Sequence, residues 1–89
     1  MTNKFRWTNS AMQKEVNESL NGYLAHSERL AKDLIQLIAD KMSGVVTELP
    51  EGNIVKITAN AREGVFGAKV RINHRRGWYR LEVIDFYGC

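Results

Sequence analysis

The densest chemistry in the sequence is a basic cluster in the second half of the chain. Twelve consecutive residues, 69–80, hold five basic side chains and no acidic one, with two aromatic rings among them. Cationic side chains neutralise phosphates and an aromatic ring stacks on a base, so this combination is typical of nucleic-acid binding. A solvated basic hairpin that discourages edge-to-edge aggregation is the alternative interpretation. The residues predicted to contact nucleic acid are Lys69, Arg71, Arg75, Arg76, Trp78 and Arg80.

Side chains that could act as nucleophile, acid or base are scattered along the chain. A Cys89–His74 pair would need a rigid site that lowers the pKa of the thiol, and Cys89 stands at the end of the sequence, where chains fray. Two histidines and one cysteine show no metal-ligand spacing. The sequence therefore predicts no enzyme, no catalytic residue, no cofactor and no metal site. The scattered candidates are His26, Ser27, Asp33, Asp40, His74 and Cys89.

Residues 64–67, Gly-Val-Phe-Gly, satisfy the GXXG pattern, which in KH domains clamps a nucleic-acid backbone. The residues on either side alternate like strands, so the helical context of that motif is missing. The stretch also lacks the spacing of a phosphate-binding loop, because Ala68 separates Gly67 from Lys69. It is therefore predicted to form a flexible bend or a bulge.

The composition is that of a small folded chain. With 89 residues, 44% of them hydrophobic and 26% charged, the sequence predicts a single domain and excludes a two-domain enzyme. The net charge of +3 favours acidic partners without requiring nucleic acid. One cysteine excludes an intrachain disulfide scaffold, and neither a signal-like stretch nor a run of about 18 apolar residues occurs. We expect synthesis in the cytoplasm and no membrane partner.

Residues 10–43 show a helical pattern, with apolar side chains spaced three and four apart. Asn9 or Ser10 is the expected N-cap, and Gly44 lies where a left-handed terminating residue is expected. The Asn21-Gly22 pair interrupts the pattern and could end one helix before a second begins, because glycine costs about 1 kcal/mol in a helix interior.

The phase of the apolar side chains bears on this interruption. Met12 and Leu30 are eighteen residues apart and therefore fall at the same angle on a helical wheel. This agreement across Gly22 favours a helix that is continuous or only bent. Two separate helices stay open as the alternative.

A continuous helix of 34 residues would be longer than the domain that carries it. Its length would be about 50 Å, against a body about 30 Å across, so one end would project and need another chain to cover it. Two aromatic residues in the N-terminal arm, residues 1–9, are also costly to leave in water and either fold back on the helix or dock on a neighbouring subunit. The predicted oligomer interface consists of Phe5, Trp7, Met12, Val16, Leu20 and Tyr23.

The second half of the chain has the alternation of strands. Val45–Glu48 and Ile54–Ala59 are expected on either side of a turn at Pro50, and residues 66–73 and 78–87 on either side of a turn at 74–77. The sequence therefore predicts an α+β fold. A long N-terminal helix, straight or bent at Gly22, would pack on a three- to four-stranded antiparallel sheet over residues 45–87.

The order of these parts resembles that of a known family. A short segment, Lys-Phe-Arg-Trp at 4–7, precedes a helical stretch and a sheet that ends at 78–88. In this order the chain resembles the small neck proteins of tailed bacteriophages, the head-tail connector or tail-completion family. The resemblance implies a structural ring subunit without enzymatic activity, which joins portal-side and tail-side proteins around a DNA channel. The residues similar to the end of the sheet in that family are Tyr79, Val83, Phe86 and Gly88.

Three functions follow as hypotheses. The first is a structural virion protein, a connector or tail-completion subunit that forms a homo-oligomeric ring in the host cytoplasm and then in the virion. Burying five interface side chains on partners would supply about 5–10 kcal/mol before ordering costs. The alternative is a small nucleic-acid-binding module that uses the basic hairpin. A further alternative is a phage-encoded inhibitor of a host protein.

Overall fold

The fold combines two helices with a five-stranded sheet in residues 7–88, the range that the computed structural model describes. The elements are α1 (Asn9–Leu20), β1 (Leu24–Ala25), α2 (Glu28–Lys41), β2 (Val45–Glu48), β3 (Ile54–Ala61), β4 (Gly64–Arg75) and β5 (Trp78–Gly88). The strand order is β1-β5-β4-β3-β2, and every neighbouring pair is antiparallel. The predicted α+β class is confirmed, although the sheet has five strands where three or four were expected.

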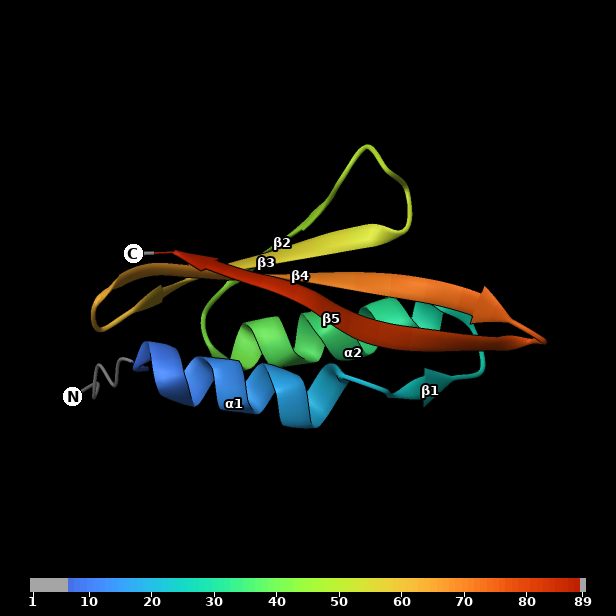
Figure 1. Ribbon diagram of the computed structural model, residues 1–89, viewed down its shortest axis with the longest axis horizontal. Helices are drawn as coiled ribbons and strands as arrows, with labels where there is room; N and C mark the ends of the chain where they lie inside the picture. Colours follow the sequence, from blue (N-terminus) through green and yellow to red (C-terminus); the bar gives the residue numbers. More distant parts are fainter. Residues whose placement is uncertain (1–6, 89) are drawn as a thin grey trace.

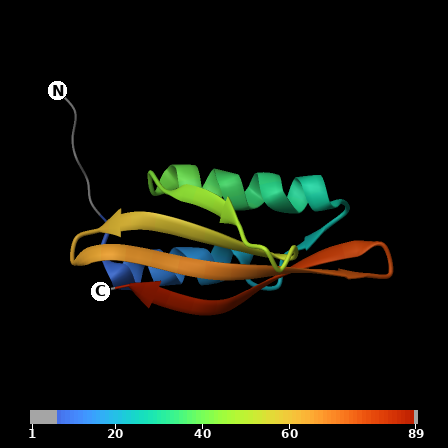
Figure 2. The same ribbon diagram turned by 90° about the horizontal axis from the view of Figure 1, so that it is seen from above.

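The two helices lie on the same face of the sheet. Figure 1 shows both helices below the strands, and in Figure 2 α1 lies behind the strands while α2 runs alongside them. α1 contacts β4 and β5, whereas α2 contacts β1, β2, β3 and β5. Within the described residues no helix covers the opposite face, which we call the open face. One sheet thus has a covered face and an open face.

The core lies between the helices and the covered face. Strand alternation points every second side chain of β3 and β4 toward the helices, as the sequence predicts for residues 54–59 and 66–72. These side chains and those from the helices form one cluster. Its largest fully buried members are Phe66, Met12, Leu20, Ile35, Ile57, Leu81, Val16 and Val70.

The prediction of one continuous N-terminal helix, which the phase favours, is wrong, because the chain forms two separate helices. α1 ends at Leu20, and Gly22 takes a left-handed φ of 83°. The amide of Gly22 then donates to the carbonyl of Leu81 at 2.7 Å, which leads the chain into β1 along the edge of β5. Both helices pack on one face of one sheet, so their apolar stripes share an orientation without being one helix.

The same turn removes the projecting end that the predicted oligomer interface needs. Met12, Val16 and Leu20 have no exposed surface, because α1 packs them against β4, β5 and α2 of the same chain. The prediction that these three residues form an interface is therefore wrong, since they belong to the core. Burial inside the chain already supplies the free energy that was assigned to a neighbouring subunit.

The ends of the helices differ from the predicted ones in detail. Thr8, and neither Asn9 nor Ser10, caps α1, since its side chain accepts from the amide of Ala11 at 3.1 Å. The left-handed residue after α2 is Ser43, with φ of 56°. Gly44 is required for a different reason, because a Cβ there would lie 2.9 Å from the carbonyl oxygen of Thr58 in β3.

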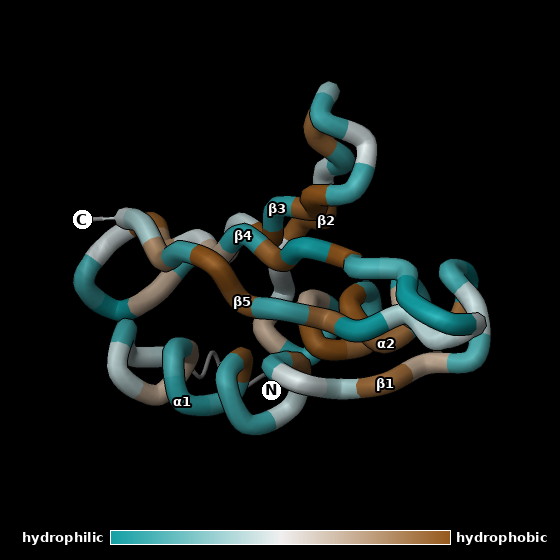
Figure 3. The backbone as a smooth tube through the Cα atoms, turned by 45° about the vertical axis from the view of Figure 1, so that its right-hand side comes forward, coloured by the Kyte–Doolittle hydropathy of each residue, from teal (hydrophilic) through white to brown (hydrophobic). Residues whose placement is uncertain are grey.

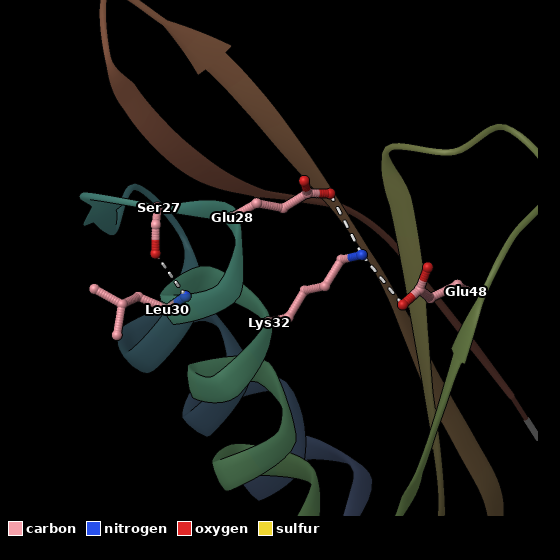
Figure 4. A network of polar contacts seen from close by, with 5 residues as sticks. All are labelled: Ser27, Glu28, Leu30, Lys32 and Glu48. Carbon is pink, nitrogen blue, oxygen red and sulfur yellow. Dashed lines mark hydrogen bonds and ion pairs between the residues drawn. The ribbon is translucent and has the colours of Figure 1, made fainter.

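Polar contacts fix the start of α2 and attach it to the sheet edge (Figure 4). The Ser27 hydroxyl accepts from the amide of Leu30 at 3.1 Å and caps the helix. The ammonium of Lys32 lies 3.3 Å from the Glu28 carboxylate and 3.2 Å from that of Glu48 in β2. Hydrogen bonding to Glu48 raises the pKa of Lys32 above its ordinary value.

Candidate functional site

The open face carries the strand side chains that alternate with those of the core. In the register of the sheet, Lys56 pairs with Lys69, which in turn pairs with Asp85. The immediate neighbours of Lys56 and Lys69 along the strands are buried in the core, so these two lysines, and Asp85 paired with Lys69, point to the open face. In β5 this alternation shifts by one residue at Ile84, because Val70 pairs with Val83 whereas Lys69 pairs with Asp85. The open face of β3, β4 and β5 thus includes Lys56, Thr58, Lys69, Arg71, Asn73, Arg75, Trp78, Arg80, Glu82, Asp85 and Tyr87.

A tight turn joins β4 to β5 at one end of this face. Arg75 pairs with Trp78, which leaves Arg76 and Gly77 as a two-residue loop. Both have positive φ, 51° and 82°, as a type I′ turn requires. Glycine adopts this conformation freely, whereas a residue with a Cβ other than Asn or Asp pays about 1–2 kcal/mol for it. Arg76 is therefore held at the tip in a backbone conformation that destabilises the turn.

Beside this tip the surface is hollowed. The hollow has a volume of about 570 Å³ and contains the indole of Trp78, which is 41% exposed. The imidazole of His26 lies against that indole, with ring centroids 4.4 Å apart and planes tilted by 36°. Pairing of Ala25 with Tyr79 in β1 and β5 places His26 there. The lining residues are Leu24, Asn73, His74, Arg75, Arg76, Trp78, Arg80 and Glu82.

Positive charge predominates around the hollow. Arg75, Arg76 and Arg80 are exposed. Among the described residues that line the hollow, Glu82 is the single acidic one, and its carboxylate lies 3.8 Å from the guanidinium of Arg71. Figure 3 shows hydrophilic residues along this end of β4 and β5. Within residues 7–88 none of these three guanidinium groups forms an ion pair with a carboxylate, which favours an anionic ligand here.

A second aromatic ring lies on the open face at the far end of β4. Tyr87 crosses over Gly67, where a Cβ would come within 2.0 Å of the ring. The Tyr87 hydroxyl is 3.0 Å from that of Thr58, and the ammonium of Lys56 lies 5.6 Å from the ring centroid. Residues 64–67 thus form part of a regular strand, and the predicted bend or bulge there is wrong. Gly67 is present because the tyrosine occupies the space of a side chain.

The predicted nucleic-acid residues are brought together on one surface. Arg75, Arg76, Trp78 and Arg80 line the hollow. Lys69 and Arg71 continue along β4 on the open face, as alternation places them. Sequence reasoning missed several neighbours of this cluster. Three of them, Asn73, His74 and Glu82, line the hollow from positions close to the predicted residues in the sequence. The others come from the β1 segment or from distant strand positions, and only the sheet register places them on this surface; they are Leu24, His26, Lys56 and Tyr87.

The residues of the predicted oligomer interface are not brought together. Phe5 lies outside the described residues, and Met12, Val16 and Leu20 are in the core. Trp7 is half-buried, packs on the core of its own chain and bridges to Ala61 in β3. Tyr23 is 47% exposed. Of the five predicted interface residues that the structure describes, Tyr23 is therefore the one that is exposed.

Of the scattered candidates for catalysis that the structure describes, Ser27, Asp33 and Asp40 make local contacts in and around α2, whereas His26 and His74 lie beside the hollow. Ser27 caps α2, and Asp33 pairs with Arg29 at 3.9 Å. Asp40 accepts from Gln36 at 2.8 Å. His26 and His74 stack on different rings, those of Trp78 and Tyr79, and Cys89 lies outside the described residues. In residues 7–88 no three His, Cys, Asp or Glu side chains gather as metal ligands would.

Comparison with known proteins gives no assignment. No family model matches the chain, and neither a curated protein nor a solved structure matches it significantly. Neither helix in the described part of the chain has the length and apolar character needed to cross a membrane.

Proposed function

We propose that this protein binds nucleic acid through the open face of its sheet, with the hollow beside the β4–β5 turn as the centre of the site. The observation that supports this most is the convergence of three exposed arginines on one hollow that also holds a half-exposed tryptophan. Arginines neutralise phosphates and the indole offers a stacking surface. The protein acts in this proposal as a binding module and not as a catalyst.

The backbone of the turn gives independent support. Arg76 holds a left-handed conformation in which asparagine would be more stable. Strain of this kind concentrates at functional positions, where the surrounding structure maintains it. An arginine at the tip extends the positive surface beyond Arg75. It thereby strengthens anion binding, while it lowers the stability of the turn.

The test is the salt dependence of binding to a labelled oligonucleotide, measured by fluorescence anisotropy between about 50 and 200 mM salt. The wild-type affinity should fall steeply over this range. The double variant Arg75→Ala/Arg76→Ala should bind at least about tenfold more weakly. Its log–log salt slope should be smaller by about 0.7 for each phosphate of a single strand that the variant no longer neutralises.

A matched double variant separates local contacts from net charge. Arg29→Ala/Lys32→Ala removes the same charge from α2, on the helical side of the molecule. It should bind like the wild type after allowance for any change in stability. Equal losses in both double variants, or an affinity that does not vary with salt, would contradict the proposal.

A second candidate function is assembly with other virion proteins, as the neck-protein resemblance implies. The observation that favours it is an exposed apolar strip on α2, where Leu30 and Leu37 are 50% and 62% exposed. They are seven residues apart and so lie on the same side of the helix, with half-buried Leu34 between them. This strip could contact another chain even though the α1 face cannot.

Native mass measurement at several protein concentrations tests the assembly candidate. Concentration-dependent oligomers that Leu37→Asp abolishes would support it, whereas oligomers unaffected by that change would contradict a contact through this strip. Leu37→Asp should leave binding to the oligonucleotide unchanged, because α2 lies on the covered side of the sheet.

A further inference from the structure

We infer that the hollow beside the β4–β5 turn takes one unpaired nucleotide, with its base stacked on Trp78, so that the nucleic acid bound is single-stranded. This inference rests on the proposed function and specifies its substrate class. Both DNA and RNA can present an unpaired base, and the experiment below has an arm for each.

The indole is placed as a stacking platform. His26 lies against one side of Trp78, which restricts the ring, while 41% of the residue remains exposed. A base can therefore stack on a ring that is already ordered, so binding does not carry the entropic cost of ordering that side chain. The volume of about 570 Å³ falls within the range of small-ligand sites, so it has room for a base and its sugar.

Phosphate binding follows from the arginines that share this hollow. Arg75 and Arg76 lie at the turn and Arg80 lies farther along β5, so cationic groups stand on both sides of Trp78 in the chain. Planar guanidinium groups bind phosphate oxygens with paired hydrogen bonds. A nucleotide stacked on the indole would thus have phosphate partners within the same hollow.

The tip of the hairpin is too wide to read a duplex as a two-stranded ribbon. A major groove admits an α-helix or two strands. Here β1 pairs with β5 as far as Ala25 and Tyr79, and His26 then packs on Trp78 beyond that pair. Three strands side by side therefore reach almost to the turn and make a platform. A platform with a stacking ring suits an unpaired strand.

The open face also offers a path for further nucleotides. Tyr87 lies over Gly67, eight residues from Arg75 on β4, which corresponds to about 26 Å along the strand. Lys69 and Arg71 lie between these ends on the same face, each beside a carboxylate of β5, Asp85 and Glu82 respectively. A single strand that enters at Trp78 can thus follow basic side chains toward a second aromatic ring.

The experiment compares oligomers of about ten nucleotides by fluorescence anisotropy: single-stranded DNA, single-stranded RNA, a blunt duplex of the same sequence, and a single strand without bases. On the wild-type protein at least one single strand should bind about tenfold more tightly than the duplex, and removing its bases should weaken binding about tenfold or more. These comparisons need no variant, so they do not depend on how well a variant folds.

Variants then locate the stacking ring. Trp78→Leu should weaken binding of the single strand about tenfold but leave binding of the baseless strand unchanged, while Trp78→Phe should retain part of the affinity. The matched control is Tyr23→Leu, since Tyr23 is an aromatic residue of similar exposure, 47%, that does not line the hollow. The variant Trp7→Phe leaves Trp78 as the one tryptophan of the sequence, so its fluorescence can be measured by itself. That fluorescence should be quenched when a single-stranded oligonucleotide saturates the protein.

The outcomes separate the two proposals. Equal affinity for duplex and single strand, or a Trp78→Leu protein that remains folded and binds as the wild type does, overturns the stacked nucleotide while salt-dependent binding leaves the proposed function intact. Absence of binding to all four oligomers overturns the proposed function and this inference together.

Discussion

The two faces of the sheet use the same strands for opposite purposes. On the covered face Phe66 and Val70 have at most 1% of their surface exposed and pack beneath the helices. On the open face of the same strand, Lys69 and Arg71 remain in contact with solvent. The covered face therefore determines stability and the open face is available for binding. Substitutions on the two faces should affect different measurements.

The largest expected effect is on the covered side. Leu20→Ala should lower the free energy of unfolding by about 2–5 kcal/mol, because it removes a fully buried side chain from α1 and leaves a cavity. Denaturant titration checks this. If Leu20 served an interface between subunits, the loss would instead appear as dissociation, with little change in the unfolding of the monomer.

A smaller loss of stability is expected where the open face is itself packed. Gly67→Ala should destabilise the protein by about 1–3 kcal/mol, since the new Cβ would occupy the position of the Tyr87 ring. The companion change Tyr87→Ala opens that space. The double variant should therefore lose less stability than the sum of the two single variants. Strict additivity would contradict the packing of Tyr87 over Gly67.

A substitution in the β4–β5 turn should change stability and affinity in opposite directions. Arg76→Asn is expected to raise the free energy of unfolding by about 0.5–1 kcal/mol, because asparagine tolerates a positive φ better than arginine does. Affinity for an oligonucleotide should fall at the same time. A gain in both properties would show that Arg76 has no part in binding.

The smallest effect concerns an ion pair that joins the helices. The hydrogen bond from Lys41 at 2.9 Å, together with one from Ser19, lowers the pKa of Glu15 below its ordinary value of 4.5. Because the pKa of Glu15 is lower in the folded state than in the unfolded state, its ionised form stabilises the protein at any pH above the ordinary pKa. This contribution is lost as the pH falls through the lowered pKa of the folded state. Glu15→Gln should thus cost about 0.5 kcal/mol at neutral pH.

Thermal or denaturant unfolding at several pH values checks this dependence. The difference between Glu15→Gln and the wild type should shrink as the pH drops below 4.5 and vanish once Glu15 is protonated in both states. A difference that stays constant down to low pH would contradict an electrostatic role for the pair.

The sheet could be predicted more fully than the helices. Alternation in residues 66–72 identifies the covered face directly, because each strand residue has its own side. The break at Gly22 could not be predicted from phase, since two helices on one sheet face keep the same phase as one long helix. β1 is two residues long, too short for alternation to reveal it.

The candidate site could be predicted in part. The basic residues and Trp78 are neighbours in the sequence, and their clustering is visible there. His26 joins them only because β1 returns to the edge of β5, a contact that depends on the unpredicted turn at Gly22. The existence of the hollow therefore could not be predicted from the sequence, whereas the positive charge around it could.

The most direct test of the division between the two faces is an NMR titration of the ¹⁵N-labelled protein with a single-stranded oligonucleotide. We predict that the largest shift changes occur at the amides of Arg75, Arg76 and Arg80 and at the indole N–H of Trp78, with small changes in α1 and α2. Changes concentrated in the helices, or none at saturating oligonucleotide, would contradict binding through the open face.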